Sequence, residues 1–136
     1  ARAADRLHRE TGAEVCIHPL DADHARRQGV GIDETFELGE QIGPFRVIGV
    51  PGKSPGEVAL FDSARRLLIV GDALIGHPEG QLSLLPDRVV DDPKQLRASV
   101  RELLQLDFDL LLLGDGCSLL ANARAALEAL VARFPD

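Results

Sequence analysis

The segment VPGKSPGEVALF, residues 50–61, constrains the fold of this chain more than any other stretch. It places two Pro-Gly pairs, at 51–52 and 55–56, around Lys53 and Ser54, and an alternating strand pattern follows directly. Proline fixes φ and glycine accepts conformations that other residues avoid, so together they predict a tight, defined turn. Lys53 is one of only two lysines among 15 basic residues, so we do not interpret it as one of many surface cations.

The same arrangement of a buried strand followed by a polar turn occurs twice more. LLIVGDAL, residues 67–74, carries Asp72, and LLLLGDGCS, residues 110–118, carries Asp115. Polar residues at the ends of several strands are the usual way in which an α/β scaffold assembles a site. The pattern therefore predicts a site that contains Lys53, Asp72 and Asp115.

Hydrophobic periodicity predicts a layered α/β chain around these turns. The strands at 57–62 and 66–72 read as a hairpin, and the continuous apolar strand at 108–116 is of the kind buried on both faces. Asp21 and Ser118 are expected to cap the helices that follow them. The predicted helices are 3–11, 21–29, 92–106 and 118–134, and the other predicted strands are 13–19, 35–42 and 44–50.

Composition excludes several classes of function. The 136 residues suit one domain, and the net charge of −7 argues against nucleic-acid and anionic-membrane partners. No apolar run approaches the roughly 20 residues of a membrane span. Two cysteines make no disulfide framework, so we expect a reduced, cytoplasmic setting. The chain lacks methionine and opens on a helical pattern, so we expect it to begin partway into a longer protein.

The chain has the segment VPGKSPGEVALFDSARRLLIVGDAL, then a helix, then LLLLGDG and a last helix. The order of these motifs resembles the C-terminal half of the metallo-β-lactamase superfamily. The resemblance implies an α/β fold, a four-layer αββα sandwich of which this chain covers mainly the C-terminal half. Residues 1–136 would be a single domain whose N-terminal part, with any H-x-H-x-D-H motif, is not present.

The resemblance also assigns roles to the three turns. It implies a metal-binding histidine at the position of Lys53, a metal-bridging carboxylate at Asp72 and a last histidine at the position of Asp115. A protonated lysine has no lone pair to give a metal. We therefore expect a hydrolase-like protein with a degenerate site that is metal-free or binds metal weakly. Zinc or another divalent metal would bind, through Asp72, only if upstream ligands are intact.

Any activity implied by the family is metal-assisted hydrolysis of an ester, thioester or amide, with Asp72 as the catalytic carboxylate. The alternative is a non-catalytic binding module on the same fold. We expect Lys53, Ser54, Asp115 and His77 to line a pocket for an unknown small molecule. Lys53 is expected to form an ion pair with Asp72, Asp115 or both. Lys53 also fits a solvated turn residue, and the two aspartates fit residues that cap their own turns.

Two further possibilities stay open. Cys117 lies at a predicted strand-to-helix turn, where a helix N-terminus favours the thiolate, and this would suit a cysteine-dependent enzyme. A half-sandwich exposes an apolar sheet face, which predicts either an upstream half of the same chain or a homodimer partner to cover it.

Overall fold

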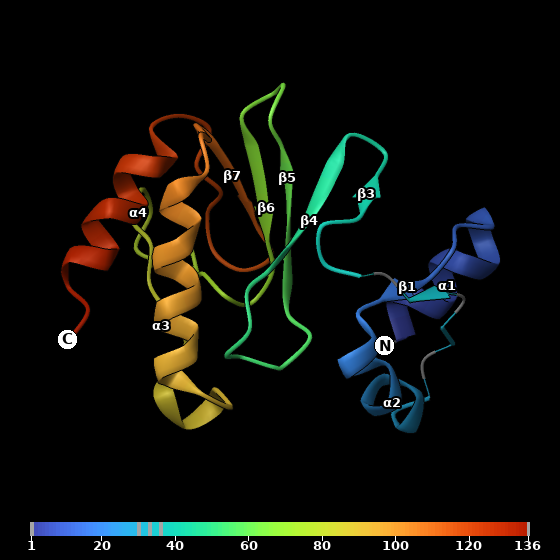
Figure 1. Ribbon diagram of the computed structural model, residues 1–136. Coiled ribbons are helices and arrows are strands. Elements are labelled where there is room, and N and C mark those ends of the chain that lie inside the picture. The colour runs from blue at the N-terminus through green and yellow to red at the C-terminus, as the bar shows by residue number, and fades with distance from the viewer. Residues whose placement is uncertain (1, 30, 33, 36, 136) are drawn as a thin grey trace.

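The structure is a computed structural model, and it describes residues 2–29, 31–32, 34–35 and 37–135 (Figure 1). Within these residues the helices are α1 (Arg2–Thr11), α2 (Pro19–Arg27), α3 (Pro93–Glu102) and α4 (Ala123–Ala132), with short 3-10 turns η1 (Asp87–Val89) and η2 (Leu103–Gln105). The strands are β1 (Cys16–Ile17), β2 (Glu34–Thr35), β3 (Gln41–Ile42), β4 (Phe45–Gly49), β5 (Val58–Asp62), β6 (Leu67–Val70) and β7 (Leu110–Leu113).

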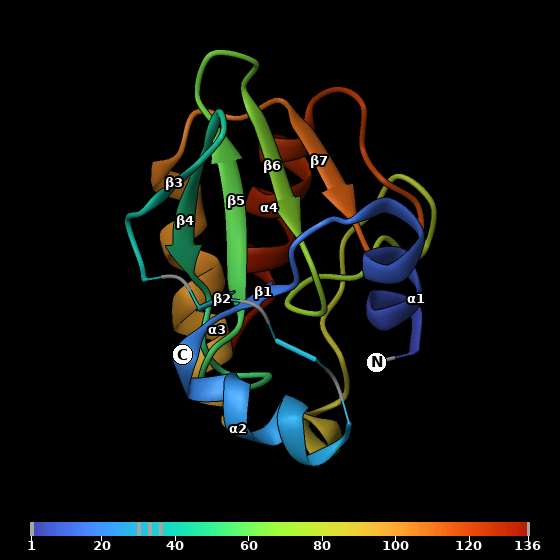
Figure 2. The same ribbon diagram turned by 90° about the vertical axis from the view of Figure 1, so that its right-hand side faces the viewer.

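Strands β3 to β7 form one sheet in that order. β4 and β5 are antiparallel, with Gly49 opposite Val58. β5 and β6 form the predicted hairpin, with Ala59 opposite Val70, and β7 runs parallel to β6, with Leu113 opposite Val70. The β4–β5 turn and the ends of β6 and β7 therefore lie at one end of the sheet, the end next to α2 in Figure 2.

Helices α3 and α4 cover one face of the sheet, as Figure 1 shows. Alternate strand residues, including Phe61, Leu68 and Leu111, join the helix residues Val100 and Leu127 in a single buried cluster. Each fully buried aliphatic side chain of this kind stabilises the fold by about 2 kcal/mol. The mixed α/β layering predicted from the sequence is confirmed.

The second face of the sheet is also apolar. Leu60, Ile69 and Leu112 lie opposite one another on β5, β6 and β7, and all three are half-buried. The N-terminal segment, with α1, α2 and the parallel pair β1–β2, lies on this side of the sheet in Figure 1.

Four predicted elements differ from the structure. The strand predicted at 35–42 is not continuous, because β2 ends at Thr35, β3 begins at Gln41 and residues 38–39 form a turn. The strand predicted at 13–19 is confined to β1, and the strand at 108–116 is confined to β7, an edge strand with one fully buried residue, Leu111. The last helix begins at Ala123 instead of 118, because Asp109 accepts the backbone N–H of Asn122 at 2.9 Å and holds the preceding residues as a loop. Ser118 therefore caps no helix; its Oγ accepts the N–H of Leu113 at 3.0 Å.

Among the described residues, no helix combines the length and the apolar character that crossing a bilayer requires.

Candidate functional site

The β4–β5 turn is fixed in place by α3. Gly52 has φ +140°, and a Cβ added there would fall 2.4 Å from the Cα of Leu96, so only glycine lets the two backbones approach this closely. The Gly52 carbonyl accepts the N–H of Asp92 at 2.8 Å, and the Pro51 carbonyl accepts the Ser99 hydroxyl at 2.8 Å. These contacts hold the turn, and the side chains that it carries, in a fixed position relative to α3.

Asp21 holds the other side of the turn. Its two carboxylate oxygens accept the Ser54 hydroxyl at 2.8 Å and the Gly56 N–H at 3.1 Å. The prediction that Asp21 caps α2 is wrong: His18 is the N-cap, and its Nδ1 accepts the N–H of Leu20 at 3.2 Å. Asp21 lies in the first turn of the helix, where its carboxylate reaches out to a distant loop.

Lys53 is half-buried at the tip of this turn. Across the described part of the chain, no carboxylate lies within 4.0 Å of its ammonium, so the predicted ion pair with Asp72 or Asp115 is not formed. Its charge acts instead on Glu57, whose pKa it lowers. Lys53 therefore opposes, without reversing, the rise in the pKa of Glu57 that burial causes.

Glu57 is a site residue that the sequence reasoning missed. Its Oε1 accepts the backbone N–H of Asp72 at 3.1 Å. Burial raises the pKa of Glu57 above its ordinary value, and the charges of Asp72 and Asp21 raise it further, against the opposing effects of the Asp72 hydrogen bond and of Lys53. The signal was available, because the predicted hairpin places the start of β5 opposite the residue that follows β6.

Asp72 and Asp115 follow β6 and β7 at the same end of the sheet. Both side chains are exposed. The glycines before them are neighbours: a Cβ added at Gly114 would lie 4.0 Å from the Cα of Gly71. The structure thus brings the backbones of these two strand ends together beside the turn that carries Lys53.

His77 and Cys117 belong to two loops that pair next to Asp115. Gly76 donates its N–H to the Asp115 carbonyl at 3.0 Å, and its carbonyl accepts the N–H of Cys117 at 2.8 Å. His77 is exposed directly after this pairing. Cys117 is an exposed free thiol, and because α4 begins only at Ala123, the predicted position at a helix N-terminus is wrong.

The side chains at this end of the sheet do not fit the metal centre that the family resemblance implies. An ammonium at Lys53 cannot ligate a cation and repels it. Among the residues that the structure describes, no three His, Cys, Asp or Glu side chains are grouped to hold a metal ion. What the arrangement offers is a half-buried cation, Lys53, and a half-buried carboxylate, Glu57, whose pKa the charges of Asp72 and Asp21 raise.

Comparisons with known proteins agree on one family. A family model described as the metallo-beta-lactamase superfamily matches residues 1–134. The crystal structure of TTHA1623 in a di-iron-bound form is 30% identical and aligns over 96% of this chain and 68% of that one, with a TM-score of 0.69.

Two more distant structures share the fold. A metallo-beta-lactamase from Pontibacter korlensis is 18% identical over 96% of this chain and 62% of that one, with a TM-score of 0.73. The metallo-beta-lactamase family protein TTHA1429 from Thermus thermophilus is 19% identical over 88% of this chain and 52% of that one, with a TM-score of 0.63. This chain thus spans less than two thirds of both. None of the curated proteins compared with the chain matches it.

Proposed function

Because this chain belongs to the metallo-β-lactamase superfamily, we propose that it is a hydrolase-like protein of that fold with a degenerate metal site. The observation that carries the proposal is Lys53, a half-buried cation on a rigid turn, at the position where the family resemblance implies a metal-binding histidine. A site built this way binds divalent metal weakly or not at all, since it has lost one ligand and gained a like charge.

The family resemblance implies metal-assisted hydrolysis, and the di-iron-bound form of TTHA1623 shows that a protein similar to this chain binds metal. In that reaction the metal would supply an activated water that attacks an ester, thioester or amide carbonyl. Asp72 is the only family ligand retained at the positions described, and it would hold the metal if further ligands are supplied from outside residues 1–136.

Metal analysis of the purified full chain tests this proposal, together with a hydrolysis screen on ester, thioester and amide substrates. We expect well under one equivalent of zinc, iron or manganese, and no hydrolysis that a chelator abolishes. One equivalent or more of bound metal, with chelator-sensitive hydrolysis, would overturn the degenerate-site proposal.

A second candidate function is a non-catalytic binding module. It is favoured by a cavity of about 560 Å³ that Lys53 and Ser54 line together with α2. Cavities of this size accommodate small organic ligands without any need for a metal. The two candidates separate in the same screen, because a binding module takes up a ligand and leaves it unchanged.

We further propose a reduced, cytoplasmic setting and an interface on the second face of the sheet. The setting is supported by Cys117, a free thiol that is exposed at the surface. The interface is supported by the apolar residues Leu60, Ile69 and Leu112, which an upstream half of the same chain or a second copy would cover.

A further inference from the structure

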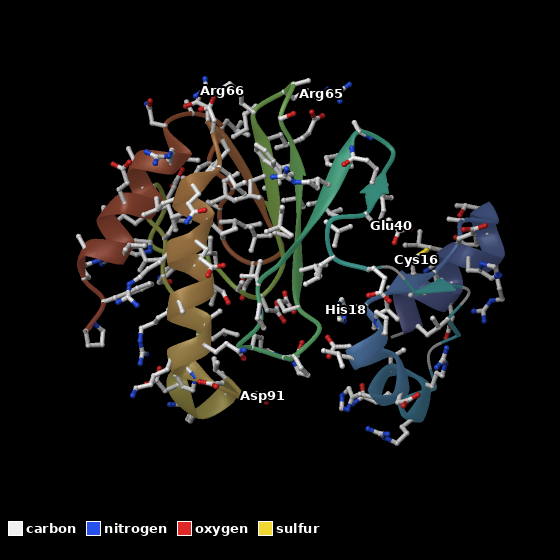
Figure 3. All side chains as sticks on the ribbon, viewed as in Figure 1. Cys16, His18, Glu40, Arg65, Arg66 and Asp91 are labelled. Atoms are coloured by element: carbon white, nitrogen blue, oxygen red, sulfur yellow. The ribbon has the colours of Figure 1, made fainter. Side chains whose placement is uncertain are left out.

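We propose that the cavity between α2 and the β4–β5 turn is a binding site for a small organic carboxylate with an apolar body. The cavity has a volume of about 560 Å³. One wall is α2 with Ile17 before it, and the other is the turn from Lys53 to Pro55 with Asp91. Figure 3 places His18, where α2 starts, on one side of the turn and Asp91, before α3, on the other.

Both walls of the cavity are fixed before any ligand arrives. Asp21, on α2, joins them through its hydrogen bonds to Ser54 and Gly56. The turn is held from behind by the N–H groups of Asp91 and Asp92, which donate to the carbonyls of residues 53 and 52 at 3.4 and 2.8 Å. A preformed cavity binds its ligand with little loss of conformational freedom.

Two cations on the cavity lack an ion-pair partner. In the described part of the chain, neither Lys53 nor Arg27 has a carboxylate within 4.0 Å. Asp21, in contrast, already accepts two hydrogen bonds from the turn. A ligand carboxylate in the cavity would give the ammonium of Lys53 the ion-pair partner that it lacks.

The charges of the residues that line the cavity indicate which class of ligand it would bind. Lys53 and Arg27 are matched by Asp21 and Asp91 among the lining residues, so the formal charge of the cavity is close to zero. A singly charged carboxylate is therefore better tolerated than a phosphate ester with two charges, which Asp21 and Asp91 would repel.

The remaining lining residues supply an apolar surface. Ile17, Leu20 and Pro55 all line the cavity, and Leu20 is 64% exposed. An apolar ligand body would cover Leu20 and remove it from water. Together with Lys53, these residues point to a short-chain aliphatic carboxylate.

This inference rests on the proposed function in one respect: both require Lys53 to be free of a bound metal. The test is an NMR titration of the full chain with sodium hexanoate, and with hexanamide as the uncharged probe, repeated in the presence of EDTA. We expect hexanoate to shift the backbone amide signals of residues 17–28 and 53–54, and hexanamide to bind at least about tenfold more weakly.

Matched variants separate the contribution of the Lys53 charge to hexanoate binding from that of the Leu20 side chain. Lys53→Met is expected to weaken hexanoate binding at least about tenfold, Lys53→Arg to retain most of it, and Leu20→Ala to weaken it severalfold. Lys94→Met is the control for lysine, and Leu120→Ala, at a leucine that is 71% exposed and does not line the cavity, is the control for leucine. The Arg and Leu20 variants keep the test informative if Lys53→Met does not fold.

Three outcomes overturn this inference and leave the proposed function standing: no shifts in this region, equal binding of hexanamide, or binding that the Lys53 and Leu20 variants leave unchanged. Hexanoate binding that EDTA abolishes would belong to a bound metal and would overturn the proposed function as well. Absence of metal together with absence of hexanoate binding would overturn the carboxylate site alone.

Discussion

At the scale of single residues, Glu57 changes the interpretation of Lys53. The sequence motifs place a lysine where the family resemblance implies a metal ligand, and the structure adds a half-buried carboxylate on the same turn. The carboxylate of Glu57 accepts the N–H of Asp72, so it also ties β5 to the strand end that carries the retained family residue. The charge of Lys53 is therefore opposed within its own turn.

A pair of substitutions at Glu57 tests this arrangement. The pKa of Glu57 is raised, so the folded protein binds its proton more readily than the unfolded chain, and ionised Glu57 destabilises the fold as pH rises through that pKa. We expect Glu57→Gln, which keeps an acceptor for Asp72, to equal or exceed the wild type in free energy of unfolding at neutral pH. Glu57→Ala should lose about 1 kcal/mol.

Urea unfolding at about pH 7 and about pH 4.5 measures both variants. The advantage of Glu57→Gln should shrink at the lower pH, where the wild-type carboxyl is itself protonated. An advantage that grows as the pH falls would contradict the account.

Asp21 gives a second test at the residue scale. Asp21→Ala removes both hydrogen bonds that hold Ser54 and Gly56, so we expect a loss of about 2 kcal/mol in the free energy of unfolding. Asp23→Ala is the matched control, because Asp23 is on the same helix and forms only an exposed ion pair with Arg26, worth less than about 0.5 kcal/mol. Equal losses in the two variants would show that Asp21 does not clamp the turn.

At the scale of elements, the β4–β5 turn is positioned by its contact with α3. Alanine substitutions at two glycines compare the cost of losing this contact with the cost of backbone strain. Gly52 and Gly80 both have positive φ, but a Cβ at Gly80 meets nothing within 4 Å, whereas one at Gly52 would collide with the backbone of Leu96. The difference between alanine substitutions at the two positions therefore reports the turn–helix contact together with the greater backbone strain at φ +140°.

We expect Gly80→Ala to cost roughly 1 kcal/mol from its backbone conformation alone. Gly52→Ala should cost about 3 kcal/mol or more, because α3 must move away. Thermal unfolding followed by circular dichroism compares them. Similar melting temperatures for the two variants would mean that the turn and α3 are not held together as described.

The β5–β6 turn carries a pH-dependent contribution to stability. The hydrogen bond from the Arg65 guanidinium to Asp62, at 2.6 Å, is the main cause that lowers the pKa of this carboxyl. A lowered pKa means that ionised Asp62 stabilises the fold above its unfolded pKa, and that this stability is lost as pH falls through the folded value. We expect Asp62→Asn to be less stable than the wild type at about pH 7, with the difference fading toward about pH 3.

The control for Asp62 is Asp107→Asn, which removes an exposed ion pair with Arg66 and should change stability little at any pH. A difference between wild type and Asp62→Asn that is constant from neutral to acid pH would contradict the role given to this carboxylate.

The elements that the sequence predicted well are those with local signals. Pro-Gly pairs, the short hairpin turn and strand-end glycines act over a few residues, so the convergence of the three polar turns followed from the predicted topology. Asp21 was missed as a site residue because its hydrogen-bond partners lie 33 to 35 residues away, whereas the contact of Glu57 with Asp72 follows from the predicted hairpin register and was overlooked. The start of the last helix was misplaced because Asp109 holds the loop before it by a tertiary contact.

At the scale of the whole molecule, one end of a five-stranded sheet collects every polar turn that the sequence singled out. One face of that sheet is closed by α3 and α4, and α2 is joined to the polar end through Asp21. The family's fold is thus retained here, and we propose that the chemistry of its metal positions is changed. The account depends on the claim that Lys53 prevents tight metal binding at this end of the sheet.

The most direct test of this claim is a calorimetric titration of zinc, iron(II) and manganese(II) into the metal-free full chain and its Lys53→His variant. Lys94→His is the control for a new histidine elsewhere. Replacing an ammonium with an imidazole restores a ligand and removes a like charge, so we predict metal affinity at least on the order of tenfold higher for Lys53→His than for the wild type or the control. Tight, stoichiometric binding by the wild type, unchanged in Lys53→His, would contradict the account.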